Sequence, residues 1–140
     1  MKTEKVSVNL SPTELGQIDL LVERGLYDNR SDFMRAAARK ALETHAADFQ
    51  QFLEPRHLKD EAETELMWAL GIARLTKSEV AHFISKGKKL NIRVIGIFNV
   101  EGSITPEEIK QVVLSCKVSG KLIADDSVKD ALGYLRESGN

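Results

Sequence analysis

The run Lys5–Leu10 alternates polar and apolar residues. Its two valines and its leucine recur at every second position, so an extended strand places them on one face. The polar residues of the run share the other face, where all three can donate hydrogen bonds: Lys5, Ser7 and Asn9. One isolated strand cannot satisfy its own backbone or bury its apolar side. The pattern therefore predicts that this strand pairs with a second copy of the chain.

The apolar period becomes that of a helix after Ser11. Ser11 and Glu14 form a capping-box pattern, and Pro12 between them suits the first helical position. Gly25 favours the end of this helix, because glycine readily adopts the left-handed conformation. The apolar residues between these signals lie on one helical face: Leu15, Ile18, Leu21 and Val22.

A second helical pattern begins near Asn29, which is a capping residue. The pattern predicts a helix to about His45, and an extension as far as Leu53 stays open. Its apolar stripe combines aromatic and small side chains: Phe33, Met34, Ala37, Ala41 and Leu42. Residues 1–45 are too few to enclose a sufficient core in one copy, so the sequence predicts an obligate dimer.

These elements resemble the ribbon–helix–helix family, which includes the Arc, MetJ and CopG-type repressors. The resemblance covers residues 1–45 and rests on Lys-Val-Ser-Val-Asn-Leu, the capped helix, and Gly-Leu-Tyr-Asp-Asn-Arg-Ser-Asp-Phe before the second helix. It implies that two strands pair antiparallel across a dimer and enter the major groove of double-stranded DNA. It also implies two groups of DNA-contacting residues: Lys5, Ser7 and Asn9 at bases, and Asn29, Arg30 and Ser31 at phosphates.

The chemistry of both groups suits these roles. Asn9 presents a donor and an acceptor to adenine, Lys5 donates to guanine, and a serine serves either base. The free N–H groups at the start of the second helix suit an anion, and Arg30 adds a charge-assisted contact. The plainer alternatives are a solvated strand face for the first group and simple helix capping for the second.

The middle of the chain, Arg56–Lys89, is predicted to be helical. Its apolar residues fit a helical spacing, with Trp68 as a large anchor: Leu66, Met67, Leu70 and Ala73. Thr76 and Glu79 form a second capping box, whose helix ends at Gly87.

The last third contains an internal repeat. The run Ile92–Phe98 aligns with Cys116–Leu122, each with a glycine in the same place. Each run is followed by a helix cap and a helical pattern, which predicts a β-α-β-α repeat with parallel strands. The glycines favour a bulge or a close approach of backbones.

The sequence therefore predicts an α+β protein. A ribbon–helix–helix dimerisation module occupies residues 1–50, and a small α/β domain, with helices and then the β-α-β-α repeat, occupies residues 56–140. We expect this second domain, which we assign to no family, to serve in higher oligomerisation or in effector binding.

Charge and composition restrict the partners. The net charge of the chain is −1, and residues 1–45 carry seven cations and seven anions, for a net charge of 7 − 7 = 0. DNA affinity must then come from a local basic patch, or from several dimers on adjacent sites, rather than from general attraction. The single cysteine fits a reducing compartment, and no signal peptide or membrane-spanning run is apparent. We expect a cytoplasmic protein without a membrane partner.

Metal and catalytic sites have little support. The residues that could ligate a metal are widely scattered along the chain: His45, His57, His82 and Cys116. We expect Cys116 to be a buried small apolar residue. No nucleophile elbow, phosphate-binding loop or metalloprotease motif is present. The sequence predicts neither an enzyme nor a bound metal or cofactor.

The leading hypothesis is a transcriptional repressor that reads operator DNA with an intersubunit ribbon. An antitoxin that controls its own operon and binds a toxin protein through its C-terminal part is the main alternative. A partition or architectural DNA-binding protein, and a protein-interaction module without DNA, also stay open.

Overall fold

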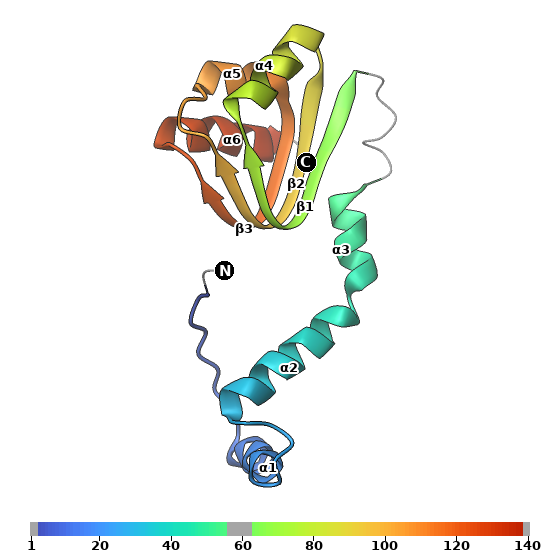
Figure 1. Ribbon diagram of the computed structural model, residues 1–140, viewed down its shortest axis with the longest axis vertical. Coiled ribbons are helices and arrows are strands. Elements are labelled where there is room, and N and C mark those ends of the chain that lie inside the picture. The colour runs from blue at the N-terminus through green and yellow to red at the C-terminus, as the bar shows by residue number, and fades with distance from the viewer. Residues whose placement is uncertain (1–2, 56–62, 139–140) are drawn as a thin grey trace. The chain divides into compact units, whose positions relative to one another are not determined.

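The computed structural model describes residues 3–55 and 63–138. The chain divides into two compact units, Met1–Ala46 and Ala47–Asn140, and each is considered by itself (Figure 1).

The first unit consists of an extended segment and two helices, α1 (Pro12–Glu23) and α2 (Arg30–Glu43). The predicted capping box of α1 is present: the Ser11 hydroxyl accepts from the Glu14 N–H at 3.2 Å, and the Glu14 carboxylate accepts from the Ser11 N–H at 3.0 Å. Gly25 follows α1 with a φ of +76°, as predicted for a left-handed helix end.

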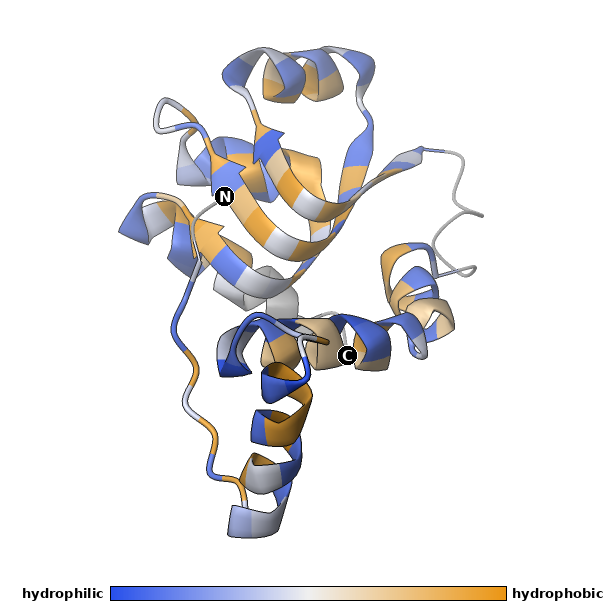
Figure 2. Cartoon of the chain, turned by 60° about the horizontal axis from the view of Figure 1, so that its bottom comes forward, coloured by the Kyte–Doolittle hydropathy of each residue, from blue (hydrophilic) through white to orange (hydrophobic). Residues whose placement is uncertain are grey.

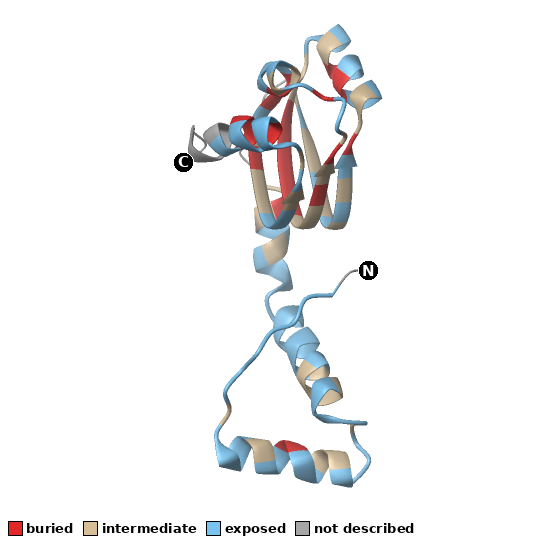
Figure 3. Cartoon of the chain, turned by 90° about the vertical axis from the view of Figure 1, so that its left-hand side faces the viewer, coloured by how far each residue is buried: buried red, intermediate tan, exposed pale blue. Residues whose placement is uncertain are grey.

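This first unit buries very little of its apolar surface. Ile18, which is 6% exposed, is the one buried side chain between residues 3 and 46. Figure 3 shows the unit mostly in the colour of exposed residues, with intermediate stretches on both helices. Val6 and Val8 are 81% and 58% exposed. The described part of the unit therefore lacks a core of its own. Helices are stabilised mainly by packing of their apolar faces, so these two helices need a further surface to pack against.

The second helix ends earlier than the open extension to Leu53. Glu43 is the last residue of α2, and the Thr44 hydroxyl donates to the Ala41 carbonyl at 2.6 Å. A separate helix, α3 (Ala46–Leu53), follows at the junction of the units.

The second unit contains a parallel sheet with strand order β1-β2-β3. Each strand is followed by a helix. The elements in chain order are β1 (Thr64–Leu75), α4 (Lys77–Lys86), β2 (Lys89–Val100), α5 (Pro106–Val112), β3 (Val113–Ile123) and α6 (Asp126–Ser138). The predicted alignment of the two runs is confirmed, because Ile92 lies beside Cys116 and Phe98 beside Leu122 in the sheet, an offset of 24 residues.

The prediction of helical structure across Arg56–Lys89 is wrong for residues 64–75, which form β1; residues 56–62 lie outside the described residues. The unit is thus a strand–helix repeat used three times, not helices followed by two repeats. The error has a physical cause, because β1 is apolar at consecutive positions and such a run fits a helical as well as a strand pattern. The capping box at Thr76 and the end of α4 at Gly87 are confirmed.

A row of glycines crosses the sheet. Gly71, Gly96 and Gly120 are neighbours in register, with φ values of +124°, +132° and +128°. Residues with a side chain rarely adopt this conformation. Figure 1 shows each strand turning sharply along its length, so that its two arms face each other. We assign this turn to the glycine row, which the spacing of Gly96 and Gly120 had predicted as a bulge or close approach.

The core of the second unit lies between these arms and the helices. Ile92, Val94 and Phe98 of β2 are each 0% exposed, as is Ile109 of α5. Figure 2 shows the strands as mostly hydrophobic and α4 as mixed. The prediction that Cys116 is buried is confirmed, because it is 4% exposed in this core.

On β2 and β3, polar side chains occupy the face of the sheet opposite the core residues Ile92, Val94 and Phe98. Arg93, which is 5% exposed, donates to the Ile92 carbonyl at 2.9 Å and to the Ser115 hydroxyl at 3.2 Å. The Ser115 hydroxyl in turn donates to the Asn91 side-chain oxygen at 2.7 Å. Burial lowers the pKa of Arg93. These hydrogen bonds satisfy polar groups that would otherwise be costly to bury.

Candidate nucleic-acid interface

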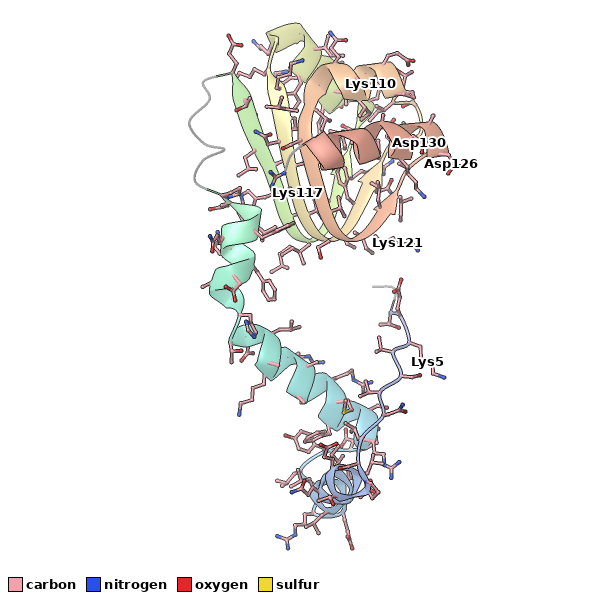
Figure 4. All side chains as sticks on the ribbon, turned by 180° about the vertical axis from the view of Figure 1, so that it is seen from behind. Lys5, Lys110, Lys117, Lys121, Asp126 and Asp130 are labelled. Atoms are coloured by element: carbon pink, nitrogen blue, oxygen red, sulfur yellow. The ribbon has the colours of Figure 1, made fainter. Side chains whose placement is uncertain are left out.

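The extended segment that precedes α1 presents its polar side chains to solvent. Lys5, Ser7 and Asn9 are all exposed, and Figure 4 shows the Lys5 side chain projecting outward from the segment. Residues 3–10 have no regular secondary structure in the single chain. The exposed Val6 and Val8 supply the apolar side of a strand that has no partner within the described first unit.

The start of α2 has the geometry of an anion site. The Asn29 side chain caps the helix by accepting from the Asp32 N–H at 2.8 Å. The backbone N–H groups of Arg30 and Ser31 donate to no acceptor within residues 3–55 and 63–138. Both groups point along the helix axis from its first turn, where the helix dipole favours negative charge. Asn29 therefore acts as a cap and leaves two backbone N–H donors at the start of the helix without an acceptor among the described residues.

Arg30 itself has a partner that the sequence did not reveal. Its Nε and Nη2 atoms donate to the two carboxylate oxygens of Asp19 in α1, each at 2.8 Å. The two side chains are 60% and 49% exposed. Arg30 is thus held in a bidentate pair that joins the two helices. Three of its five donors lie outside this pair, so a second anion can still be contacted.

Asp19 remains ionised in this pair. The hydrogen bonds from Arg30 lower the pKa of the Asp19 carboxyl, and they outweigh the opposite effect of burial. A carboxyl with a lowered pKa stabilises the fold above its ordinary pKa and loses that contribution as the pH falls through the lowered value. At neutral pH, Asp19 therefore competes with any phosphate for the Arg30 guanidinium.

An apolar groove lies between the two helices of the first unit. Its volume is about 320 Å³. Its lining is mostly apolar and includes the buried Ile18: Leu10, Glu14, Gln17, Ile18, Leu21, Phe33, Met34 and Ala37. Tyr27 packs edge-on against the Phe33 ring, with ring centroids 5.0 Å apart, and so fixes the turn before α2.

The structure brings together only one of the two predicted groups. Asn29, Arg30 and Ser31 share the start of α2, whereas Lys5, Ser7 and Asn9 lie on the separate extended segment. Within the described chain, no hydrogen bond or ion pair joins the two groups. Asp19 is the residue that sequence reasoning missed, since it lies on a different helix from Arg30.

The other candidate chemistry can be placed as far as the structure reaches. Residues 3–55 and 63–138 contain no cluster of three or more His, Cys, Asp or Glu side chains that could hold a metal ion. His45 and His82 are exposed, Cys116 is buried in the second unit, and His57 lies outside the described residues. No helix in the same ranges is long and apolar enough to cross a membrane.

A sequence model of the Ribbon-Helix-Helix transcriptional regulator family matches residues 1–129. The match covers most of the chain, and the chain therefore belongs to this family. Comparisons with curated proteins and with solved structures returned no match. The family is one of DNA-binding regulators, which typically form dimers and are typically not enzymes. The family match extends through the second unit as far as α6.

Proposed function

We propose that this protein is a sequence-specific repressor of transcription that reads the major groove with a ribbon formed by two copies of the chain. The observation that carries the proposal is the extended segment of residues 3–10, whose alternating polar and apolar side chains are exposed. Pairing two such segments antiparallel would cover the apolar side chains and satisfy the backbone. Lys5, Ser7 and Asn9 would then face the bases of double-stranded DNA.

We assign the apolar groove of the first unit to the homodimer contact. Among residues 3–46 only Ile18 is buried, and the groove beside it offers Leu21, Phe33 and Met34 to a partner. A second copy has the same groove and the same exposed valines, so a two-fold arrangement can cover both sets of apolar side chains. The free energy of this burial would compensate for the missing core of a single copy.

The two-fold symmetry of this dimer predicts the symmetry of the DNA site that the protein selects. DNA recovered with the full chain from genomic fragments should contain a short inverted repeat, because a two-fold protein matches a two-fold site. A Leu21→Glu chain should recover none of these sites, since the added charge lines the groove. A Leu20→Glu chain should recover them as the unaltered protein does. Leu20 is the neighbouring residue, is 47% exposed and does not line the groove, so it controls for the charge.

Sequencing of the bound fragments provides the measurement, and mobility shifts on the selected site confirm it. Recovery of random fragments by the unaltered chain would contradict sequence-specific recognition. Equal loss of binding in the Leu20 and Leu21 variants would contradict the groove as the dimer contact, because charge alone would then explain the effect.

We further propose that Asn29, Arg30 and Ser31 hold a DNA phosphate. Two free N–H groups and the helix dipole supply the site, and Arg30 would add charge while its other side holds Asp19. An Arg30→Ala chain should bind all sequences more weakly and reduce the salt dependence of binding by about one unit of slope. An Asp19→Asn chain should bind all sequences more tightly, because a competing negative charge is removed.

Fluorescence anisotropy on specific and random duplexes at several salt concentrations measures both effects. An Arg39→Ala chain removes a cation from an exposed position further along α2 and gives the background effect of charge. A loss in the Arg30 variant that is confined to one sequence would contradict a phosphate contact.

The second unit is proposed to act in oligomerisation or in effector binding. Its core, which includes Phe98 and Ile109 at 0% exposure, favours a domain that folds by itself over a tail that folds on a toxin. The antitoxin alternative would be supported by a neighbouring toxin gene or by a small protein that copurifies with the chain.

A further inference from the structure

The β1 edge of the sheet is the least protected apolar surface of the second unit. Trp68, Leu70 and Ile72 are 46%, 65% and 63% exposed. No charged side chain occurs from Leu66 to Ala73. Free sheet edges are usually protected by charges, bulges or a covering element, because their unpaired backbone groups attract another strand. This stretch of β1 has neither a charge nor a covering helix in the described unit.

The opposite end of the sheet is protected in both ways. β3 carries Lys117 and Lys121, and α6 packs on it. Figure 4 shows α6 lying across this end, with both lysines labelled on β3, whereas Figure 1 shows β1 at the opposite edge of the sheet from β3. The unit therefore has one closed end and one end that can accept a strand.

The glycine row shows where an added strand would fit. A Cβ at Gly96 would lie 2.0 Å from the Gly71 carbonyl oxygen, and a Cβ at Gly120 would lie 2.1 Å from the Gly96 carbonyl oxygen. In both cases the space beside the glycine is filled by the preceding strand. The same space at Gly71 is empty to 4 Å, since no strand precedes β1 in the sheet. At the open edge, the backbone of Gly71 can therefore be approached by another strand as closely as Gly96 is approached by β1.

We propose that β1 pairs antiparallel with β1 of a second copy, with Gly71 opposite Gly71 and a two-fold axis through the turn. A strand that follows both arms of β1 must turn where β1 turns. A reversed copy of β1 satisfies this condition, because the axis exchanges its two arms and leaves the turn in place. A straight strand from another protein would follow one arm only.

The residues that this register brings together are compatible. Leu70 lies opposite Ile72, since 70 + 72 equals 71 + 71, and Trp68 lies opposite Arg74 by the same sum. The first pair joins two exposed apolar side chains, and the second places a cation beside an aromatic ring. No two like charges meet between residues 67 and 75. Because the β3 end is closed by α6, the pairing stops at two units rather than forming a fibre.

Disulfide trapping tests this register in the full chain. A Leu70→Cys chain and an Ile72→Cys chain, each with a different tag, are co-expressed and oxidised. Opposite residues of paired strands lie within reach of a disulfide, so we expect a covalent heterodimer of twice the chain mass. Both residues are exposed, so the substitutions should leave the fold intact, and the buried Cys116 should not react.

The matched control uses the other edge. Ser119 and Lys121 flank Gly120 as Leu70 and Ile72 flank Gly71, and both are exposed. Co-expressed Ser119→Cys and Lys121→Cys chains should give no covalent heterodimer. The proposal is overturned if the β1 pair is trapped no more than the β3 pair, or if β1 cysteines are trapped on a different polypeptide. DNA binding does not enter the measurement, so this test is separate from that of the proposed function.

Discussion

Alanine at Gly96 is expected to unfold the sheet of the second unit. The added Cβ would lie 2.0 Å from the Gly71 carbonyl oxygen, which belongs to the backbone of the neighbouring strand and cannot move aside without breaking the pairing. The φ of +132° at this position adds the cost of a conformation that suits glycine alone. The free energy of unfolding should fall by more than about 3 kcal/mol, which is a large part of the stability of a domain.

Two further alanine variants separate the causes of this loss. Gly71 has a similar φ of +124° but no atom of its own chain within 4 Å of its Cβ position, so within one chain Gly71→Ala should cost the conformational part alone, about 1–3 kcal/mol. The same alanine should also weaken the proposed β1–β1 pairing, whose partner strand would occupy this space. Gly133 lies in α6 with open space around it and no positive φ. Gly133→Ala should stabilise the unit by up to about 1 kcal/mol, because alanine favours helix.

Denaturant titration of the full chain measures these differences. Trp68 is the single tryptophan and lies in β1, so its fluorescence reports the unfolding of the sheet. The expected order of stability is Gly133→Ala, then the unaltered chain, then Gly71→Ala, and finally Gly96→Ala. Equal losses at Gly71 and Gly96 in protein dilute enough to dissociate the β1–β1 pairing would show that the close approach of the strands within one sheet does not limit the residue at Gly96.

The elements whose signals are local could be predicted from the sequence. Ser11 with Glu14 and Thr76 with Glu79 mark helix starts by hydrogen bonds that span three residues, and such bonds depend little on the rest of the fold. Gly96 and Gly120 were recognised as a repeat because each lies at the same place in a strand-like run that is followed by a helix cap. Strand pairing then followed from the offset.

The strand β1 could not be assigned in the same way. Its apolar residues occupy consecutive positions from Leu66 to Leu70, so a helical face and a strand face fit equally well. The spacing of the glycines carried the missing signal, since Gly71 precedes Gly96 by 25 residues and Gly96 precedes Gly120 by 24. A third copy of the repeat was therefore present in the sequence, 25 residues before Gly96.

The candidate interface shows the same division. Asn29 was correctly predicted as a cap, because its bond to the Asp32 N–H is local. The pair between Arg30 and Asp19 depends on how α1 packs against α2, which no local pattern specifies. The sequence therefore predicted the donors at the helix start but not the Asp19 carboxylate that binds the Arg30 side chain.

Replacement of Lys5, Ser7 and Asn9 by alanine is expected to abolish sequence-specific DNA binding. Each side chain that contacts a base contributes about 1–3 kcal/mol of discrimination. Loss of all three should lower affinity for the selected site on the order of a thousandfold, to the level of random DNA. The three residues are exposed and no side-chain hydrogen bond or ion pair joins them to the described part of the first unit, so the fold should be unaffected. Circular dichroism and a mobility shift on the selected inverted repeat measure the two properties.

The size and the selectivity of this loss distinguish base contacts from general attraction. The triple variant loses one cation, and a Lys40→Ala chain loses one cation from an exposed position in the last turn of α2. General attraction depends on the net charge, and each variant loses one cation. It therefore predicts equal losses for both variants on all sequences. Base contacts predict that the triple variant loses affinity for the selected site alone, while Lys40→Ala weakens all sequences slightly. A triple variant that still protects the selected site normally would show that the segment before α1 does not read the DNA.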